Sequence, residues 1–330
     1  MAVAVMDHPL DLVTSVDGAD GTACVGADLM GGKVSIHVRP SHPPTPAEAG
    51  DDRARRDAVR VMRRIAAWSG RLTRFSPGSE LSLLNADSAA SVAIGPTLAS
   101  VLTTAQEAGR ATGGIVDPTV LPARLAAEQP DARARMPLPS DRSWQIEPGS
   151  RGSVVRRRRG TTFDLGGVAK GWIADRAVAA LAGYPAVLVD ADGDLAVALA
   201  FGQAWRIGVA DPRTDGENLA TVELRGLDPS SPQRFGLATS GTSVHRWSHD
   251  GQATHHLIDP RFGGPAVTDV IQATVLAESA TAAEAAAKTI VILGSSRTEA
   301  MLAQPGVWAC VVLTESGRIL ASPSTLRWLA

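Results

Sequence analysis

The sequence predicts an α+β fold, in which amphipathic helices are combined with strands that follow one another directly along the chain. Apolar residues recur at three- and four-residue steps over residues 53–75 and 96–113, the spacing of a helix with one buried face. Between residues 186 and 239, five short β patterns are separated by turn residues alone. An α/β fold would instead alternate strands with helices along its whole length, so we expect α+β.

The N-terminal half contains both unpatterned and periodic segments. Residues 1–27 lack periodicity, and we expect a loose tail there. The alternating valines and isoleucine of residues 34–38 predict a strand, and the proline-rich residues 40–52 predict a loop. Helices are expected over 53–75, ending before a Pro-Gly pair, and over 96–113, where Pro96 suits a first helical turn. Residues 122–150 give no clear pattern.

The C-terminal half is richer in strands. Residues 153–165 resemble a hairpin that turns at Gly160, and its four consecutive arginines (156–159) are expected on an exposed, alternating strand rather than in a phosphate-binding patch. The remaining patterns predict helices over 170–182 and 281–293 and strands over 186–189, 195–198, 205–209, 221–224, 236–239, 271–277 and 308–313.

Composition excludes some classes of partner. The 330 residues carry 32 Lys+Arg and 34 Asp+Glu, a net charge of -2, which gives no long-range field for nucleic acid or an anionic membrane. No apolar run approaches the roughly 18 residues of a membrane span, and the acidic start does not resemble a signal peptide. The two cysteines form no disulfide or metal motif. We therefore expect a cytoplasmic protein with one domain over residues 28–330.

The segment 164–171 (DLGGVAKG) is the strongest chemical signal. An acid, Asp164, ends a strand pattern, two glycines permit close backbone approach, and Lys170 opens a helix. Backbone N–H groups, a positive helix end and an ammonium together suit a diphosphate. The segment matches neither the P-loop nor the Rossmann pattern. The alternative is a tight turn with an exposed lysine.

Two other segments carry weaker signals. In His255-His256, one imidazole could face a cleft while its neighbour on the strand faces away, and a neutral histidine can accept a proton near pH 7. Each Asp-Pro pair, at Asp117 and Asp259, can equally be a turn former. The small-residue loop that begins at Thr239 is a plausible adenine or phosphate contact.

Seven motifs occur in the order of one known family. They are Met30-Gly31, 79–85 (SELSLLN), 114–119 (GIVDPT), 164–171, 239–241 (TSG), 256–260 (HLIDP) and 284–294. The chain thus resembles the ApbE family of FAD:protein FMN transferases over about residues 28–315. The resemblance implies an ApbE-like fold, with mixed or antiparallel sheets flanked by helices around a central FAD-binding cleft.

The resemblance also implies an activity and a site. Enzymes of this family bind FAD, split its diphosphate with the help of Mg2+, and join FMN to a Ser or Thr of a separate FMN-binding acceptor protein, releasing AMP. His256 matches the catalytic base, and the backbone carbonyl of Gly167 matches a metal ligand. The residues expected to contact FAD are Met30, Ser79, Glu80, Leu81, Asp117, Asp164, Lys170, Thr239 and Ile258.

The chain departs from the family at two positions. Glu284 and Lys288 stand where the family usually has an Asp and a Thr that hold magnesium. Because an ammonium offers no oxygen ligand, Lys288 would compete with the ion. One interpretation is a helix start, with Thr281 and Glu284 as a capping box, plus an i,i+4 ion pair between Glu284 and Lys288. The other is that the Lys288 ammonium replaces the cation beside Lys170; the chain has only three lysines, and two lie in these motifs.

These alternatives lead to different functions. A flavin transferase would yield AMP and a flavinylated protein. With altered metal ligands, the chain could instead bind FAD or hydrolyse it to FMN and AMP without protein transfer. A scaffold protein with a vestigial site would bind no flavin.

Overall fold

One antiparallel sheet organises the molecule. The computed structural model describes residues 10–16, 20–42, 53–128, 138, 143–149, 152–243, 246–249, 252–303 and 305–329. Within them the main sheet has nine strands in the order β1-β2-β3-β7-β8-β11-β16-β17-β18, and every neighbouring pair is antiparallel. The strands are β1 (Val13–Val16), β2 (Ala23–Leu29), β3 (Gly32–Arg39), β7 (Ala186–Ala191), β8 (Asp194–Leu199), β11 (Gln233–Gly241), β16 (Val270–Ala277), β17 (Val307–Thr314) and β18 (Ile319–Ala321).

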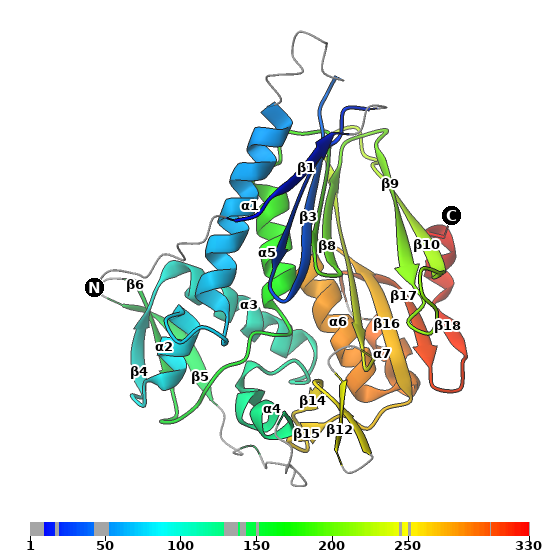
Figure 1. Cartoon of the computed structure of the whole chain (residues 1–330). Coiled ribbons are helices and arrows are strands. Elements are labelled where there is room, and N and C mark those ends of the chain that lie inside the picture. Colours follow the sequence, from blue (N-terminus) through cyan, green and yellow to red (C-terminus); the bar gives the residue numbers. More distant parts are fainter. Residues whose placement is uncertain are drawn as a thin grey trace.

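Helices cover one face of this sheet, and a hairpin covers part of the other (Figure 1). The helices are α1 (Arg53–Leu72), α2 (Glu80–Ala86), α3 (Pro96–Ala111), α4 (Leu121–Ala127), α5 (Ala169–Ala179), α6 (Ala280–Leu293) and α7 (Thr298–Leu302), with short 3-10 turns η1 (Pro118–Val120), η2 (Ser295–Arg297) and η3 (Pro323–Arg327). The hairpin on the opposite face is β9 (Ala204–Ala210) with β10 (Asn218–Arg225). The combination of helices with antiparallel strands confirms the predicted α+β class.

The middle strands are apolar on both faces because both faces are covered. In β7, Val187 and Val189 pack in the core under α1 and α5, whereas the alternate Leu188 packs with the β9–β10 hairpin. Successive side chains of a strand point to opposite faces, so both sets are buried. On α1, Ala58, Met62 and others at helical spacing are fully buried, as the periodicity predicts.

The N-terminal segment differs from the prediction. The expected loose tail over residues 1–27 is wrong for 13–16 and 23–27, which belong to β1 and β2. Ala23, Val25 and Ala27 alternate inward and are buried. Their small size makes the period-2 pattern faint in the sequence, although β2 pairs with β3 over seven residue pairs. That residues 28–330 form one domain stays a prediction.

A second, three-stranded sheet replaces the expected hairpin over 153–165. β6 (Gly152–Arg157) pairs with β4 (Ser91–Ile94) and β5 (Trp144–Gly149), not with residues 161–165. Residues 161–165 are not a strand, because the Phe163 N–H donates to the Asn85 side chain at 2.7 Å and the Asp164 N–H donates to the carbonyl of Pro118 at 2.7 Å. The unpatterned residues 122–150 include most of α4 and all of β5.

The arginine run is only partly exposed. Arg156 is exposed, as predicted, but Arg157 is 5% exposed. The Arg157 guanidinium donates to the carbonyl oxygens of Leu84 at 2.8 Å and Thr161 at 2.7 Å. It thereby satisfies a carbonyl at the end of α2 that has no intrahelical partner. Arg157 is a structural residue.

Other predictions agree with the structure within a few residues. The helices predicted over 53–75, 96–113, 170–182 and 281–293 are α1, α3, α5 and α6, and the predicted strands from 34–38 to 308–313 correspond to β3, β7, β8, β9, β10, β11, β16 and β17. Most of the predicted loop over 40–52 lies outside the described residues. Cys24 and Cys310 are both free thiols. Among the described residues, no helix has the length and apolar character needed to cross a bilayer.

Candidate functional site

Two turns at one end of the main sheet lie against each other. Met30 has a positive φ of 58° in the turn between β2 and β3, and Asp192 has the same φ in the turn between β7 and β8. The Asp192 N–H donates to the carbonyl of Lys33 at 3.1 Å. A Cβ on Gly32 would lie 2.0 Å from the Asp192 carboxylate, so this contact requires glycine. Met30 is therefore held beside the acidic β7–β8 turn.

Lys170 is bound by that acidic turn. Its ammonium lies 3.1 Å from the Asp194 carboxylate and 3.7 Å from that of Asp192, and it donates to the Asp192 carbonyl at 3.1 Å. Burial on its own would lower the pKa of Lys170, but Asp194, Glu284 and Asp192 outweigh it and raise the pKa above its ordinary value. Burial raises the pKa of Asp194. Lys170 is therefore not the exposed lysine of the alternative interpretation. Its ammonium already has partners within the protein.

The backbone of the segment 164–171 is also largely engaged within the protein. The Gly166 N–H donates to the Asp164 carboxylate at 2.8 Å, and the N–H groups of Val168 and Ala169 donate to the Leu165 carbonyl. The Gly171 N–H donates to the Glu284 carboxylate at 2.9 Å. The predicted diphosphate cradle is wrong for these four N–H groups, because each already has an acceptor.

The Glu284 side chain extends from α6 toward the start of α5. It is 4% exposed, and burial raises the pKa of its carboxyl to about 8. Its approach to the start of α5 depends on Gly171, where a Cβ would lie 2.7 Å from the Thr281 nitrogen. The predicted i,i+4 ion pair is wrong: Lys288 makes no ion pair with Glu284, because the two side chains leave α6 toward different neighbours.

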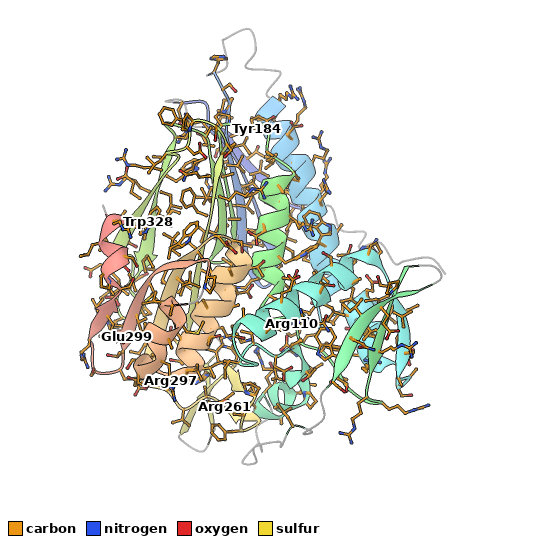
Figure 2. All side chains as sticks on the ribbon, turned by 180° about the vertical axis from the view of Figure 1, so that it is seen from behind. Arg110, Tyr184, Arg261, Arg297, Glu299 and Trp328 are labelled. Atoms are coloured by element: carbon orange, nitrogen blue, oxygen red, sulfur yellow. The ribbon has the colours of Figure 1, made fainter. Side chains whose placement is uncertain are left out.

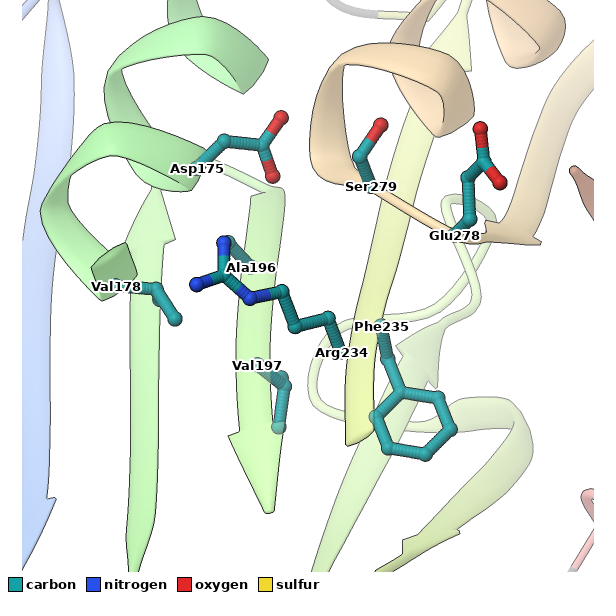
Figure 3. A pocket seen from close by; sticks show the side chains of 8 residues that line it. All are labelled: Asp175, Val178, Ala196, Val197, Arg234, Phe235, Glu278 and Ser279. Atoms are coloured by element: carbon teal, nitrogen blue, oxygen red, sulfur yellow. The ribbon is translucent and has the colours of Figure 1, made fainter. Parts of the chain in front are cut away.

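The predicted capping box is also wrong. Ser279 is the N-cap of α6, and its side chain accepts from the Ala282 N–H at 3.2 Å. Asp175 of α5 accepts from the N–H groups of Ala280 and Thr281 at 2.9 and 3.0 Å. Figure 3 shows Asp175 and Ser279 side by side at this helix start, with the Arg234 guanidinium below. Asp175 thus fixes α6 against α5 and, with it, the position of Glu284.

Lys288 lies against the glycine loop. A Cβ on Gly167 would stand 2.6 Å from the Lys288 Nζ and 3.0 Å from its Cδ, so the lysine side chain occupies the space beside that glycine. Lys288 is half-buried, and no described residue forms a hydrogen bond or ion pair with its ammonium. Burial lowers its pKa, while Asp164, Glu284 and Asp117 act in the opposite direction. Within the part of the chain that the structure describes, Lys288 is thus a cation without an ion-pair partner, although three acids and Arg124 act on it.

Two of the three acids that act on this ammonium, Asp164 and Asp117, lie on adjacent segments. Asp117 is the N-cap of η1 and accepts from the Thr119 N–H at 2.8 Å, which confirms the turn-forming interpretation of that Asp-Pro pair. The Asp164 N–H donates to the Pro118 carbonyl, so Asp164 lies beside the same segment. The predicted residues Asp117, Asp164, Gly167 and Lys288 are therefore brought together.

Arg124 connects His256 to this cluster. Its guanidinium donates to the His256 carbonyl at 2.9 Å and to Glu128 at 2.7 Å, and it is one of the charges that act on Lys288. His256 is half-buried, whereas the neighbouring His255 is buried and bonded to the Ala266 carbonyl at 3.1 Å. This agrees with the expected opposite placement of the two imidazoles. Sequence reasoning missed Arg124, because α4 gives no pattern in which one arginine is distinctive.

The turn after His256 is closed by hydrogen bonds between Asp259 and Arg261. Asp259 is 3% exposed and accepts from the Arg261 N–H at 2.9 Å and from its guanidinium at 2.6 Å. Figure 2 shows Arg261 at the lower end of the molecule. This turn joins the two-residue strands β14 (Ile258–Asp259) and β15 (Gly264–Pro265). The turn-forming interpretation of Asp259 is confirmed.

Other predicted site residues have structural partners. Ser79 is the N-cap of α2 and accepts from the Ser82 N–H at 3.0 Å. Glu80 accepts from the Gly95 N–H at the start of α3. Leu81 and Ile258 are buried, at 1% and 3% exposed, in two apolar clusters. Thr239 on β11 is exposed, 2.9 Å from the Thr274 hydroxyl. Contact of these residues with FAD stays a prediction.

Two cavities lie elsewhere. One of about 160 Å³ is the pocket of Figure 3, and one of about 400 Å³ lies among α3, α5, α6 and α7. Neither is lined by a predicted site residue. The central FAD-binding cleft therefore stays a prediction.

The residues around Lys288 do not fit the Mg2+ that the family resemblance implies. Mg2+ requires near-octahedral oxygen ligands. Among the residues that the structure describes, no three His, Cys, Asp or Glu side chains form a set that could hold a metal ion. The ammonium beside Gly167 offers no lone pair. A magnesium ion held by Gly167 and Glu284 is therefore not supported.

Comparison with known sequences identifies one family. The model of the ApbE family matches residues 30–312. A curated FAD:protein FMN transferase of Treponema pallidum is 32% identical over 190 residues, covering 54% of this chain and 50% of its own. Another, of Salmonella typhimurium, is 28% identical over 244 residues, covering 67% and 66%. The chain thus spans between half and two thirds of the length of these relatives.

Solved structures share the fold. The apo flavinyl transferase ApbE of Pseudomonas stutzeri superposes with a TM-score of 0.72 at 19% identity, over 97% of this chain and 98% of that one. The ApbE protein of Thermotoga maritima gives 0.70 at 22% identity, over 97% and 100%. At these identities, the similarity establishes the fold.

Proposed function

The chain belongs to the ApbE family, and on this premise we propose that it transfers the FMN moiety of FAD to a serine or threonine hydroxyl of an acceptor flavoprotein and releases AMP. The relatives named FAD:protein FMN transferase support this proposal. The observation that carries it from the structure is the cluster in which Asp117, Asp164, Gly167 and Lys288 meet the segment of His256.

The proposed reaction is a single displacement at phosphorus. The acceptor hydroxyl oxygen forms a bond to the phosphorus on the FMN side of the diphosphate, and the bond from that phosphorus to the bridging oxygen breaks. AMP leaves with the electron pair of the broken bond. His256 accepts the hydroxyl proton, so that the attacking oxygen gains nucleophilic character as the bond forms.

The remaining residues have positioning roles in this proposal. Arg124 holds the His256 backbone from α4, and the hydrogen-bonded Asp259 turn follows His256 along the chain. Lys170 and Asp194 fix the start of α5 against the β7–β8 turn. We also propose a cytoplasmic location, which the two free cysteines support, and an acceptor that carries its Ser or Thr on a separate FMN-binding domain.

The test is covalent labelling of an acceptor. The full chain is incubated with FAD and an FMN-binding acceptor domain, and flavin fluorescence on the denatured acceptor and released AMP are measured. We expect equal amounts of labelled acceptor and AMP. FMN and AMP without labelled acceptor would mean FAD hydrolysis, and bound, unchanged FAD would mean a binding protein; either result would overturn the proposal.

A variant of the proposed base sharpens this test. His256→Ala should reduce the rate of transfer about 100-fold or more, because a general base is lost, while FAD binding persists. His42→Ala changes an exposed histidine and serves as the control. Transfer by His256→Ala at the wild-type rate would remove His256 from the mechanism.

A further inference from the structure

The two lysines of the site differ in what surrounds them. Lys170 has two carboxylates within 4 Å and a carbonyl acceptor, so its charge is balanced within the protein. Lys288 is half-buried and has no such partner among the described residues. An ammonium taken partly out of water without an acceptor is unfavourable for the folded chain, because the lost hydration is not replaced. Such a group is explained if a ligand supplies the missing acceptor.

The position of Lys288 defines the kind of acceptor. Its Nζ lies beside Gly167, at the turn that leads into the N-terminus of α5. Four neighbouring N–H groups of this segment are already bonded within the protein. The Lys288 ammonium is thus a donor that remains available there, and it is a compact charge with three N–H groups, which suits phosphate oxygens.

The family resemblance implies a metal ion at this place, because Gly167 and Lys288 match positions of its ligands. The side-chain oxygens there do not form a metal-binding set among the described residues. An ion at this place would also meet repulsion from the ammonium beside Gly167. A cation and Lys288 therefore exclude each other at this place.

We propose that the Lys288 ammonium serves as a built-in cation for the FAD diphosphate, in place of a bound Mg2+. This inference rests on the proposed function, because FAD is the diphosphate that the proposed reaction requires. Burial lowers the pKa of Lys288, and Asp164, Glu284 and Asp117 act against this effect, while Arg124 adds a second positive charge on the side of His256. FAD binding and transfer then need no divalent ion.

The test measures FAD binding rather than turnover. Quenching of flavin fluorescence gives the Kd of the full chain for FAD in EDTA and in MgCl2, for the wild type, Lys288→Met, Lys288→Arg and Lys33→Met. Lys33 is exposed on β3 and is the matched control. We expect the wild type to bind FAD equally in both buffers. Lys288→Met should raise the Kd about 10- to 100-fold, the loss of one charge-assisted hydrogen bond. Lys288→Arg should bind better than Lys288→Met, and Lys33→Met should bind like the wild type.

Failure of this inference and failure of the proposed function would give different results. Loss of wild-type FAD binding in EDTA with recovery in MgCl2, or a wild-type Kd for Lys288→Met, would overturn the inference and leave the proposed transferase standing. No FAD binding by the wild type in either buffer would overturn the proposed function itself. If Lys288→Met does not fold, as judged by circular dichroism, Lys288→Gln replaces it and the same criteria apply.

Discussion

The surroundings of Lys170 and those of Lys288 are two charged regions on neighbouring parts of the same fold, and they are built in opposite ways. Around Lys170, the ammonium has carboxylate partners, with the Asp194 carboxylate 3.1 Å away and only 3% of its side chain exposed. Around Lys288, acids lie nearby, but none forms an ion pair with the ammonium among the described residues. The first region stabilises the fold, and the second keeps a charge available for a ligand.

The largest effect is expected where the charges are balanced. Asp194→Asn removes the buried partner of Lys170 and should lower the free energy of unfolding by about 3 kcal/mol, because a buried ammonium loses its counter-charge. Asp192→Asn is the matched control, since Asp192 is 39% exposed at 3.7 Å and asparagine tolerates its positive φ. Asp192→Asn should lower the free energy of unfolding by less than about 1 kcal/mol. Urea unfolding followed by tryptophan fluorescence measures both, and equal losses would refute the distinction.

An intermediate effect is expected at the glycine beside Lys288. Gly167→Ala places a methyl group 2.6 Å from the Lys288 Nζ and forces the ammonium to move. FAD affinity should fall about tenfold, or about 1.4 kcal/mol, with little change in stability, because the end of a lysine side chain can shift. Gly183→Ala, where a Cβ meets nothing within 4 Å, should leave both quantities unchanged. Unaltered FAD affinity in Gly167→Ala would separate Lys288 from the ligand.

The smallest effect is expected on the stability of a Lys288 variant. Lys288→Met should change the free energy of unfolding by less than about 1 kcal/mol and should not lower it, because an unpaired, half-buried charge is removed. Urea unfolding without FAD measures this change. A loss comparable to that of Asp194→Asn would mean that Lys288 is a structural cation like Lys170.

Local pattern predicted most of the fold because the buried faces follow helical or strand periodicity. The cores under α1 and α3 have strong apolar periods, and α6 is rich in alanine and buried on most sides, so these helices were predictable. β2 was not, because its inward residues include two alanines that give little contrast with their neighbours. The partner of β6 could not be predicted either, since the Arg157 contacts that define this region join residues about 70 positions apart.

The contacts of the site could not be predicted from the spacing of residues along the chain. The spacing of Glu284 and Lys288 predicts an ion pair on one helix face. The structure separates the two side chains, because Gly171 lets the start of α5 approach α6 closely enough for its own N–H to bind Glu284. The Asp194 partner of Lys170 also depends on sheet order, in which β8 lies between β7 and β11. Such contacts exist only in the assembled fold.

The most direct test of the account is acceptor labelling by the wild-type chain in EDTA. The chain, FAD and an FMN-binding acceptor domain are combined without free divalent ions, and in-gel flavin fluorescence of the acceptor is compared with the same reaction in MgCl2. We expect labelled acceptor and released AMP in both conditions. An acceptor that stays unlabelled in both conditions, while FAD is bound, would contradict the assignment of this chain as a flavin transferase.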